Sequence, residues 1–291
     1  MPISYTELPR DIVEISGADQ RSFLQGLISQ DIEKVTAARS AYSTFLTPQG
    51  KYLHDFIMLQ CGDSLLFDCE QGRSADLVNR LSRFKLRADV ALAPKADLKV
   101  FAVFGDGAAA CLGLETTPGA TVQNGNVTIT VDPRTEKLGC RLIGPMAEIE
   151  AVLHQHDIQA SEFSSYDQRR ISLGVPDGSR DMEIEKSILL ESNIDDLHGI
   201  DWEKGCYMGQ ELTARTKYRG LVKRRLFAFE TGESKAVTGE PVVAGDKVVG
   251  DVRSTSGNLL LASVRIDALE DVETPVSLET APLKRLTPPS Y

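Results

Sequence analysis

Residues 204–215 read K-G-C-Y-M-G-Q-E-L-T-A-R, so that Cys206 follows Lys204 by two positions and lies between two glycines. In an extended chain, side chains two positions apart point to the same side, and we therefore expect Lys204 and Cys206 to face one pocket. At a separation of roughly 6.6 Å, opposite charges attract by about 0.6 kcal/mol in water and by about 2.5 kcal/mol at an effective dielectric constant of about 20. The larger value would favour the thiolate, so the pattern predicts a reactive Cys206 that Lys204 activates.

The second half of this stretch is typical of a helix that begins after Gly209, a residue suited to the N-cap position. The positive end of the helix dipole would add about 0.3–1 kcal/mol near Cys206, which is less than the contribution expected of the lysine. Gly205 and Gly209 permit backbone angles or a close ligand approach that a side chain would prevent, and Glu211 adds a carboxylate. The alternative is that Cys206 is a small buried apolar residue, as most free cysteines are.

Length and composition indicate a soluble globular protein with two or three domains. The chain has 291 residues, of which 42% are hydrophobic and 25% are charged, and it is long enough to bury a large core. Its formal net charge of -10 argues against broad, non-specific adhesion to nucleic acids or membranes but leaves local basic patches open. We expect a monomer without a membrane partner.

Cysteine usage and the amino-terminal residues indicate a reducing compartment. The cysteines are scattered, odd in number and without a C-x-x-C pair, which predicts free thiols and no permanently bound metal. They are Cys61, Cys69, Cys111, Cys140 and Cys206. Residues 1–20 lack a basic start followed by an apolar core, and no apolar run approaches the ~18 residues that a membrane span requires. These features predict a cytoplasmic location.

Strand-like and helix-like segments alternate before residue 160. A β-meander is predicted at residues 41–46, 52–59 and 64–68. An amphipathic helix at 74–87 follows, with Leu77, Leu81 and Phe84 on its apolar stripe. Further strands are predicted at residues 98–104, 127–131 and 139–143, with helices at 107–112 and 147–156. This order suggests two related α+β lobes that divide near residues 95–160.

The last part of the chain has a different pattern, with short alternating segments separated by Gly, Pro and Asp turns. Strands are predicted at residues 223–229, 241–243, 247–252, 259–264 and 275–278. They indicate a small β-barrel. The predicted domains are therefore an α+β region at 1–221 and a C-terminal β-barrel at 222–291.

The octapeptide K-G-C-Y-M-G-Q-E at 204–211, the signature segment from here on, resembles the signature of the YgfZ-type folate-binding proteins, which are relatives of the glycine-cleavage aminomethyltransferase. Other stretches resemble the subgroup that contains the mitochondrial iron–sulfur assembly factor: R-I-S-L-G-V-P at 170–176, L-L-E-S-N at 189–193 and R-T-K-Y at 215–218. F-L-Q-G at 23–26 and L-T-P-Q-G-K at 46–51 fit the amino-terminal half. The resemblance covers nearly the full chain.

This resemblance implies an aminomethyltransferase-like fold, with α+β lobes around a central folate channel and a C-terminal β-barrel. It implies tetrahydrofolate, or a derivative, as the cofactor. The implied activity is iron–sulfur cluster assembly or repair in support of [4Fe–4S] enzymes, among them enzymes that thiolate tRNA. The implied partners are folate, iron–sulfur assembly proteins and these client enzymes.

The resemblance also assigns roles to single residues. Cys206 is the signature thiol, and the residues that complete its loop are Lys204, Gly205, Tyr207, Gly209, Gln210 and Glu211. Glu191 falls where aminomethyltransferases have a pterin-binding carboxylate, which can accept two hydrogen bonds from a pterin edge. Asp55, after His54, falls where they have an acidic pair. As alternatives, Glu191 is a solvated helix-end acid, and Asp55 pairs with Lys51 or lies on an exposed strand face.

One basic cluster follows the signature segment and consists of Arg215, Lys217, Arg219, Lys223, Arg224 and Arg225. These cations suit the glutamate tail of folate, with Arg215 among the binding residues, or the phosphates of a tRNA, or simply a solvated face. Three functions stay open: a folate-dependent assembly factor, a folate-dependent aminomethyltransferase and a tRNA-contacting scaffold. A one-carbon transferase needs no thiol, so the cysteine favours the assembly factor.

Overall fold

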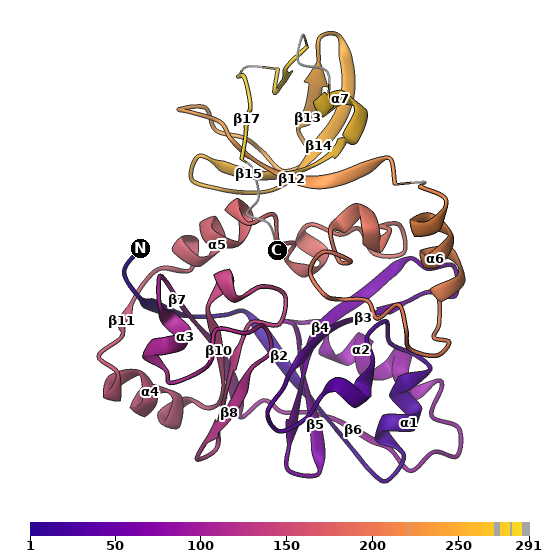
Figure 1. Ribbon diagram of the computed structural model, residues 1–291, viewed down its shortest axis with the longest axis vertical. Coiled ribbons are helices and arrows are strands. Elements are labelled where there is room, and N and C mark those ends of the chain that lie inside the picture. Colours follow the sequence, from indigo (N-terminus) through magenta and orange to yellow (C-terminus); the bar gives the residue numbers. More distant parts are fainter. Residues whose placement is uncertain (221, 271–273, 280, 287–291) are drawn as a thin grey trace. The chain divides into compact units, whose positions relative to one another are not determined.

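A computed structural model describes residues 1–220, 222–270, 274–279 and 281–286 of the chain (Figure 1). The chain divides into two compact units whose segments are distant in sequence. Unit 1 comprises Met1–Leu46, Leu53–Phe163 and Leu197–Met208, and unit 2 comprises Thr47–Tyr52, Ser164–Asp196 and Gly209–Tyr291. The domain boundary predicted between residues 221 and 222, and the division predicted near 95–160, stay predictions.

The first sheet of unit 1 has five strands in the order β3-β4-β5-β2-β6. They are β2 (Arg10–Ser16), β3 (Ala41–Leu46), β4 (Tyr52–Cys61), β5 (Ser64–Glu70) and β6 (Ala91–Pro94). The predicted meander is confirmed, since β3, β4 and β5 are neighbours. The helices α1 (Gln20–Gln25) and α2 (Ser74–Ser82) and the 3-10 turn η1 (Ile32–Lys34) contribute to one apolar core with this sheet, in which the rings of Phe56 and Phe67 stack 4.3 Å apart.

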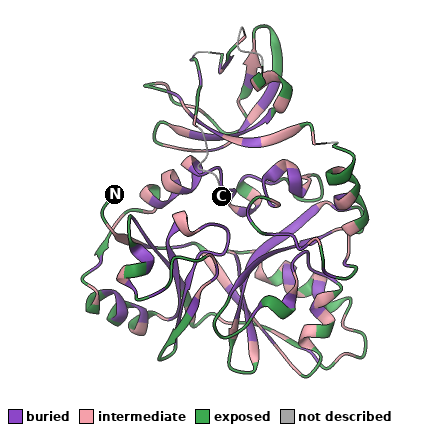
Figure 2. Ribbon diagram, in the orientation of Figure 1, coloured by how far each residue is buried: buried purple, intermediate pink, exposed green. Residues whose placement is uncertain are grey.

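The second sheet of unit 1 has six strands in the order β11-β1-β7-β10-β9-β8. They are β1 (Ser4–Glu7), β7 (Leu98–Phe104), β8 (Thr121–Asn124), β9 (Val127–Val131), β10 (Cys140–Pro145) and β11 (Gln159–Ala160). The helices α3 (Ala108–Cys111) and α4 (Met146–Gln155) pack on it and share its core, and η2 (Glu136–Leu138) precedes β10. The predicted second set of strands and helices is therefore confirmed, and Figure 2 shows the strands of both sheets as largely buried.

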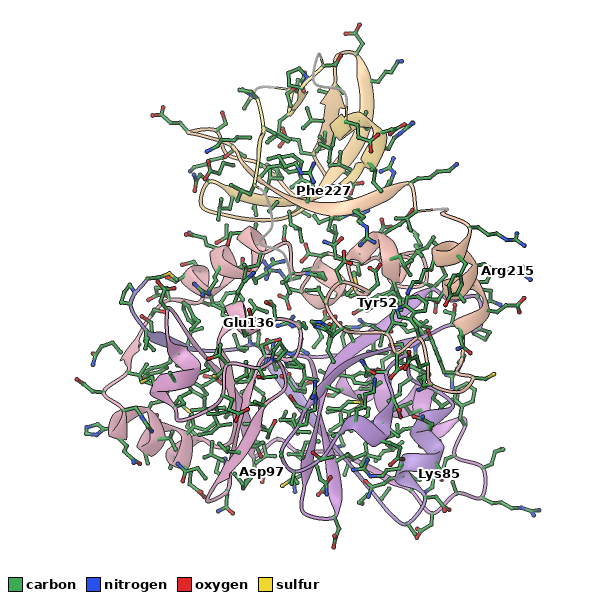
Figure 3. All side chains as sticks on the ribbon, viewed as in Figure 1. Tyr52, Lys85, Asp97, Glu136, Arg215 and Phe227 are labelled. Carbon is green, nitrogen blue, oxygen red and sulfur yellow. The ribbon has the colours of Figure 1, made fainter. Side chains whose placement is uncertain are left out.

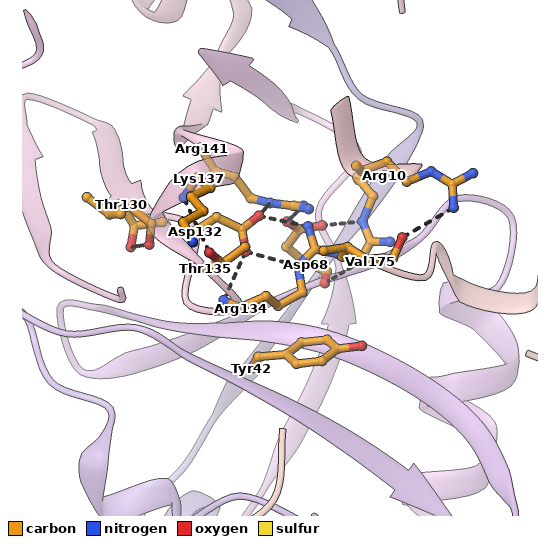
Figure 4. Close-up of polar contacts among 12 residues, drawn as sticks. Arg10, Tyr42, Asp68, Thr130, Asp132, Arg134, Thr135, Lys137, Arg141 and Val175 are labelled. Carbon is orange, nitrogen blue, oxygen red and sulfur yellow. Dashed lines mark hydrogen bonds and ion pairs between the residues drawn. The ribbon is translucent and has the colours of Figure 1, made fainter. Parts of the chain in front are cut away.

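A buried network of charges connects the two sheets of unit 1 (Figure 4). Asp68 of β5 accepts hydrogen bonds from Arg10 of β2 at 2.6 Å and from Arg141 of β10. Arg141 also donates to Asp132 at 3.1 Å, and Arg134 binds both oxygens of Asp132 at 2.9 and 2.7 Å. Burial raises the pKa of Asp132, but Arg134 and Arg141 outweigh that effect and hold the pKa well below its usual value. Because each carboxylate has cationic partners, these charges are tolerated inside the unit.

Unit 2 is built around the C-terminal sheet, whose strand order is β16-β13-β14-β15-β12-β17. The strands are β12 (Arg224–Glu230), β13 (Pro241–Ala244), β14 (Lys247–Ser256), β15 (Leu259–Arg265), β16 (Val276–Ser277) and β17 (Lys284–Arg285), with α7 (Ile266–Glu270) after β15. Alternating side chains of these strands form an apolar core that includes Phe229, Val252 and Leu260. The unit also contains nearly all of α5 (Phe163–Ser172), then η3 (Gly178–Arg180), η4 (Leu189–Ser192) and α6 (Gln210–Tyr218).

The helix predicted at residues 74–87 is shorter than expected. α2 ends at Ser82, and although Leu77 and Leu81 are buried, Phe84 is 42% exposed. Leu86 has a φ of 45°, which is incompatible with a right-handed helix. The apolar spacing correctly predicts the first two turns of the helix, but the helix ends before the further turn that would include Phe84. Among the described residues, no helix is long and apolar enough to span a bilayer.

Candidate functional site

The chain before the signature segment is fixed by Asp201, which lies in unit 1. The backbone N–H of Asp201 donates to the carbonyl of Ser29 at 3.0 Å. Its Oδ1 accepts from the backbone N–H groups of Glu203 at 2.8 Å and Lys204 at 3.0 Å, which closes a local turn. Burial raises the pKa of Asp201, but hydrogen bonds from Lys34 and from these two amides outweigh it and hold the pKa below its usual value. Asp201 therefore sets the direction in which the signature segment begins.

Lys204 holds the signature segment to a distant part of unit 1. Its Nζ donates to the carbonyl of Ile28 at 2.7 Å and to that of Gln30 at 2.9 Å, and its side chain is 8% exposed. The ammonium also lies 5.3 Å from the ring centroid of Tyr207, a buried residue. Burial lowers the pKa of Lys204 to about 8, against the opposing effect of Asp31 and Asp201. The ammonium is thus engaged with carbonyl oxygens and an aromatic face.

Cys206 is exposed, whereas Lys204 and Tyr207 on either side of it are buried. Residues 204–206 are not a strand, because the chain turns after Asp201 instead of running extended. The expectation that Lys204 and Cys206 face one pocket stays a prediction. The alternative of a buried apolar Cys206 is wrong. A thiol on a fixed loop, open to solvent, can meet a ligand or a partner protein.

Among the remaining thiols, Cys69, Cys111 and Cys140 are less exposed than Cys206, whereas Cys61 is exposed like it. Cys69 and Cys140 are buried, and burial raises the pKa of each thiol to about 12. Cys111 is half-buried, and Cys61 is exposed at the end of β4. Thiols with a pKa this high stay protonated at neutral pH and react slowly. Cys61 is therefore the natural control for any experiment on Cys206.

The second half of the signature segment begins at Gly209 and belongs to unit 2. Gly209 has a φ of 83° and is the N-cap of α6, as predicted. A Cβ at this position would lie 2.7 Å from the carbonyl oxygen of Thr47 and 2.9 Å from the Cα of Gly50. Gly50 itself has a φ of 69°, and a Cβ there would lie 3.0 Å from the carbonyl oxygen of Gly209. The two backbones are in direct contact, which only glycines allow.

Gly205 differs from Gly209 in having neither a positive φ nor a near neighbour. Nothing lies within 4 Å of a Cβ placed at Gly205. The two predicted uses of these glycines were an unusual backbone angle and a close ligand approach; Gly209 has the unusual angle, and its close neighbour is backbone and not a ligand. Open space beside Gly205 next to an exposed thiol leaves room for a ligand to approach.

The predicted residues on α6 are exposed or half-buried. Gln210 is half-buried, and Glu211 and Arg215 form an exposed ion pair on successive turns. Figure 3 labels Arg215 on this helix. An exposed pair of this kind contributes about 0.3–0.5 kcal/mol to stability. Both side chains are therefore easily recruited by a ligand.

Within the described part of the chain, Arg215, Arg224 and Arg225 of the basic cluster are already paired with acids. Arg215 pairs with Glu211, Arg224 lies 3.7 Å from Asp251, and Arg225 binds Asp195 and Asp196 at 2.8 Å. Burial lowers the pKa of Arg225, but Asp195 and Asp196 outweigh it and raise the pKa above its usual value. This pairing reduces the positive charge that the cluster offers to the phosphates of a nucleic acid.

Asp55 lies in the interior of unit 1 and not on an exposed strand face. It is 3% exposed, and its Oδ2 accepts a hydrogen bond from the hydroxyl of Tyr42 at 2.9 Å. The guanidinium of Arg134 lies 5.6 Å from the centroid of the Tyr42 ring, which connects Asp55 to the buried charge network. Burial, and then the charge of Asp55, raise the pKa of Tyr42 well above its usual value. Tyr42 therefore stays protonated and donates to Asp55.

His54 precedes Asp55 on β4 and is also buried. Its Nε2 lies 2.9 Å from the carboxylate of Asp76 on α2. Burial and the positive charge of Arg73 lower the pKa of His54 to about 4, although Asp76 opposes them. The imidazole is therefore neutral at pH 7 and adds no positive charge beside Asp55.

Glu191 lines a cavity of about 140 Å³ in unit 2. The residues around it are strongly polar and include Asp181, Glu183, Lys186, Arg224 and Arg253. The side chain of Asp181 is fully buried, and its Oδ1 has no hydrogen-bond partner among the described residues. A buried carboxylate oxygen without a donor is unusual, but the Asp181 side chain has no exposed surface, so a ligand in the cavity does not contact it.

The carboxylate of Glu191 has the hydrogen-bonding character that a pterin edge requires, because a carboxylate can accept from both the ring N–H and the exocyclic amine. The volume of 140 Å³ is smaller than the ~300–1,000 Å³ typical of whole-ligand pockets, so only part of a folate would fit in it. Among the described residues, no group of three His, Cys, Asp or Glu side chains is arranged to hold a metal ion.

The predicted site residues belong to both units. Unit 1 contains Asp55 and residues 204–207, and unit 2 contains Glu191 and residues 209–215. The sequence did not reveal Asp201, Tyr42 or Gly50 as supporting residues. An Asp three residues before Lys204 is a turn signal that could have been found. The partners of Tyr42 and Gly50 are defined only by tertiary contacts.

Comparison with known proteins first defines the class. The structure matches the glycine cleavage system aminomethyltransferase T from Bartonella henselae with a TM-score of 0.78 and 15% identity, covering 100% of this chain and 86% of that one. Residues 223–290 match the family model described as CAF17, C-terminal beta-barrel domain. The chain is thus an α+β protein of the aminomethyltransferase fold with a C-terminal β-barrel, as predicted.

Sequence relatives then identify the family. The chain is 30% identical to the iron–sulfur cluster assembly factor IBA57, mitochondrial, of Homo sapiens, over 87% of this chain and 74% of that protein. It is 30% identical to the mouse protein of the same name, over 94% and 79% of the two chains. It is 34% identical to the Neurospora crassa homolog over 75% of this chain, and spans about half of that protein, 51%. The chain belongs to the IBA57 family.

These relatives refine one prediction and correct another. The resemblance to YgfZ-type proteins was right at the coarser level, and the family is the IBA57 subgroup within it. The predicted cytoplasmic location is wrong, because these relatives are named as mitochondrial proteins. Composition and cysteine usage indicated a reducing compartment but do not distinguish one such compartment from another.

Proposed function

We propose that this protein is a folate-dependent factor for iron–sulfur cluster assembly, in which Cys206 is the reactive group and the cluster is the cargo. Membership of the IBA57 family supports the assembly role. The clients would be [4Fe–4S] enzymes, among them enzymes that thiolate tRNA. The protein acts as an assembly factor rather than as a classical transferase.

The observation that carries this proposal is the exposure of Cys206 on a loop that is fixed on both sides. Asp201 and Lys204 anchor the chain before it, and the backbone N–H of Met208 donates to the carbonyl of Gly26 at 3.1 Å after it. A fixed, solvent-open thiol is suited to contact a partner or a cluster without a large loss of loop entropy.

Tetrahydrofolate would be bound through Glu191 at the pterin edge. The reduced pterin supplies one-carbon or redox chemistry when bound. Arg215 is proposed to contact the negatively charged glutamate tail, because its ion pair with Glu211 is exposed and weak. Asp55, held by the hydroxyl of Tyr42, would be a fixed hydrogen-bond acceptor inside unit 1.

The test of the thiol is Cys206→Ser in cells that lack the native protein. We expect the variant to fold and to bind tetrahydrofolate, but to fail to restore the activity of [4Fe–4S] enzymes under oxidative stress. Cys61→Ser is the matched control, since Cys61 is also an exposed free thiol, and it should restore activity fully. Full complementation by Cys206→Ser would remove the thiol from the mechanism.

The test of the pterin site is anaerobic calorimetry with tetrahydrofolate. Glu191→Gln keeps the size of the side chain but removes its charge, and we expect about a tenfold or larger loss of affinity, because a hydrogen bond to a charged group contributes about 1.5–3 kcal/mol. Glu203→Gln, at an exposed acid of unit 1, should not change the affinity. Equal affinities for native protein and Glu191→Gln would contradict the assignment. Folate-dependent release of ammonia from an aminomethyl-lipoyl carrier at an enzymatic rate would favour a transferase instead.

A further inference from the structure

The loop after α2 combines cations with exposed apolar side chains. Residues 83–87 read R-F-K-L-R, and no acid occurs from residue 77 to residue 88. Arg83 and Arg87 are exposed and Lys85, labelled in Figure 3, is half-buried. This composition is opposite in sign to that of the whole chain, whose net charge is -10.

The loop has a defined backbone conformation. The N–H of Ala88 donates to the carbonyl of Lys85 at 2.8 Å, which closes a turn with Leu86 at its second position. Asp89 ties the end of the loop to the start of α1, because its N–H donates to the Oδ2 of Asp19 at 2.8 Å and its carbonyl accepts from the N–H of Asp19 at 3.1 Å. The turn therefore presents its residues in a fixed arrangement.

Leu86 occupies a position that disfavours leucine. Its φ is 45°, and it is the only apolar side chain among the non-glycine residues with positive φ in the described ranges. Glycine, asparagine and aspartate adopt this conformation readily, whereas a leucine is strained in it. The side chain is 91% exposed, so packing within the fold does not offset the strain. The apolar surface of Leu86 is therefore available to a binding partner outside the chain.

Phe84 provides a second apolar group and connects the loop to the core. Its ring is 42% exposed and meets the ring of Phe45 edge-on, with 6.3 Å between the centroids. One side of Phe84 thus stabilises the loop while the other is open to solvent.

The three cations of the loop have no acidic partners. Among the residues that the structure describes, no carboxylate lies within ion-pair distance of Arg83, Lys85 or Arg87. In contrast, Arg80 on the preceding turn of α2 binds Asp76 at 2.9 Å. Asp19 and Asp89 lie at the base of the loop, where their carboxylates accept hydrogen bonds from backbone amides. The positive charge at the tip of the loop is therefore available to an anionic surface.

We propose that residues 83–87 dock the protein onto an anionic lipid surface, with Leu86 and the open side of Phe84 in the interface and the cations at the phosphates. A turn of five residues is too small for a stable protein interface, which needs about 20–30 residues on each side. A lipid surface needs no matching pocket, and each nearby cation strengthens binding by about fivefold. This proposal departs from the expectation of no membrane partner, which rested on the net charge and therefore argued only against broad adhesion. The proposal does not depend on folate or on iron–sulfur chemistry.

The test is co-sedimentation of the full chain with vesicles of equal parts phosphatidylglycerol and phosphatidylcholine at low salt. We expect binding that is absent with pure phosphatidylcholine and lost at high salt. Arg83→Gln combined with Arg87→Gln should weaken binding about 25-fold. The matched control is Lys235→Gln, at an exposed cation of unit 2, which should have no effect.

Leu86→Gly separates a docking role from a structural one. The glycine relieves the strained φ, so the denaturation midpoint should stay the same or rise, while vesicle binding should weaken about tenfold because the apolar tip is gone. Val237→Gly removes another exposed apolar side chain, 66% exposed, and should leave vesicle binding unchanged. Absence of binding to the anionic vesicles, or binding that survives Leu86→Gly undiminished, would overturn the proposal. Failure of these variants has no bearing on the proposed role of Cys206.

Discussion

Residues 201–208 and residues 209–218 are consecutive in sequence, but the structure fixes them by different means. In the first region, two side chains add anchors to the backbone hydrogen bonds: the carboxylate of Asp201 accepts from two amides, and the ammonium of Lys204 donates to two carbonyls. In the second, the backbone of Gly209 packs directly on the backbone of residues 47–50. Contacts made by charged side chains depend on their protonation state, whereas the close backbone packing at Gly209 depends only on the absence of a Cβ.

This difference predicts how substitutions and pH should destabilise each region. A region fixed by an ammonium and a carboxylate should lose its contacts one at a time and respond to pH. A region fixed by backbone contact should tolerate no side chain at its crossing point but should be indifferent to pH. The exposed Cys206 belongs to the first region, and the exposed ion pair of Glu211 and Arg215 belongs to the second.

The largest effect is expected for Gly209→Ala. A Cβ would meet the carbonyl oxygen of Thr47 at 2.7 Å, and alanine disfavours a φ of 83°. Together, the left-handed conformation and the overpacking should lower the free energy of unfolding by about 2–4 kcal/mol. Chemical denaturation measures this loss.

Gly205→Ala is the control for that experiment because it makes the same chemical change in the other region. Its Cβ would have nothing within 4 Å and its φ is not positive, so the change in unfolding free energy should stay within about 0.5 kcal/mol. If both substitutions destabilise equally, the backbone contact of Gly209 is not what fixes the second region.

An intermediate effect is expected for Lys204→Met. The substitution leaves the carbonyls of Ile28 and Gln30 without their donor, and it should lower the free energy of unfolding by about 1–3 kcal/mol. Lys186→Met, at a lysine whose side chain is 76% exposed, should cost less than about 1 kcal/mol. A Lys204→Met protein as stable as the native one would show that these hydrogen bonds do not fix the first region.

The same variant should respond to pH. Burial lowers the pKa of Lys204 from 10.5 to about 8, so between these values the unfolded chain binds more protons than the folded chain. The stability of the native protein must then rise with pH in this window, relative to Lys204→Met. The difference in unfolding free energy between the two proteins is therefore larger near pH 10 than near pH 7.5. A constant difference would mean that the ammonium has a normal pKa in the folded protein.

Local sequence patterns predicted much of the fold but not the anchors of the site. The meander and the N-cap at Gly209 follow from apolar spacing and glycine chemistry, which act over a few residues. The acceptors of Lys204 are 176 and 174 residues away in sequence, and no local pattern reports such a contact. Because local spacing does not reveal these distant acceptors, the sequence predicted only that Lys204 faces its neighbour Cys206. The early end of α2 was missed because apolar spacing continues to Phe84 while the backbone does not.

The smallest effect is expected for the residue proposed to carry the chemistry. Cys206 is exposed, so Cys206→Ser should change the free energy of unfolding by less than about 0.5 kcal/mol. The comparison is Cys69→Ser, where a hydroxyl would replace a buried thiol that lies 3.4 Å from the carbonyl oxygen of Asp11; this should cost about 1–3 kcal/mol. Denaturation curves of the two variants measure the contrast. A strongly destabilised Cys206→Ser would mean that the thiol supports the loop, and a structural thiol would not be free to contact a cluster. A silent substitution means that the thiol does not hold the loop, and that the sulfur is available for chemistry.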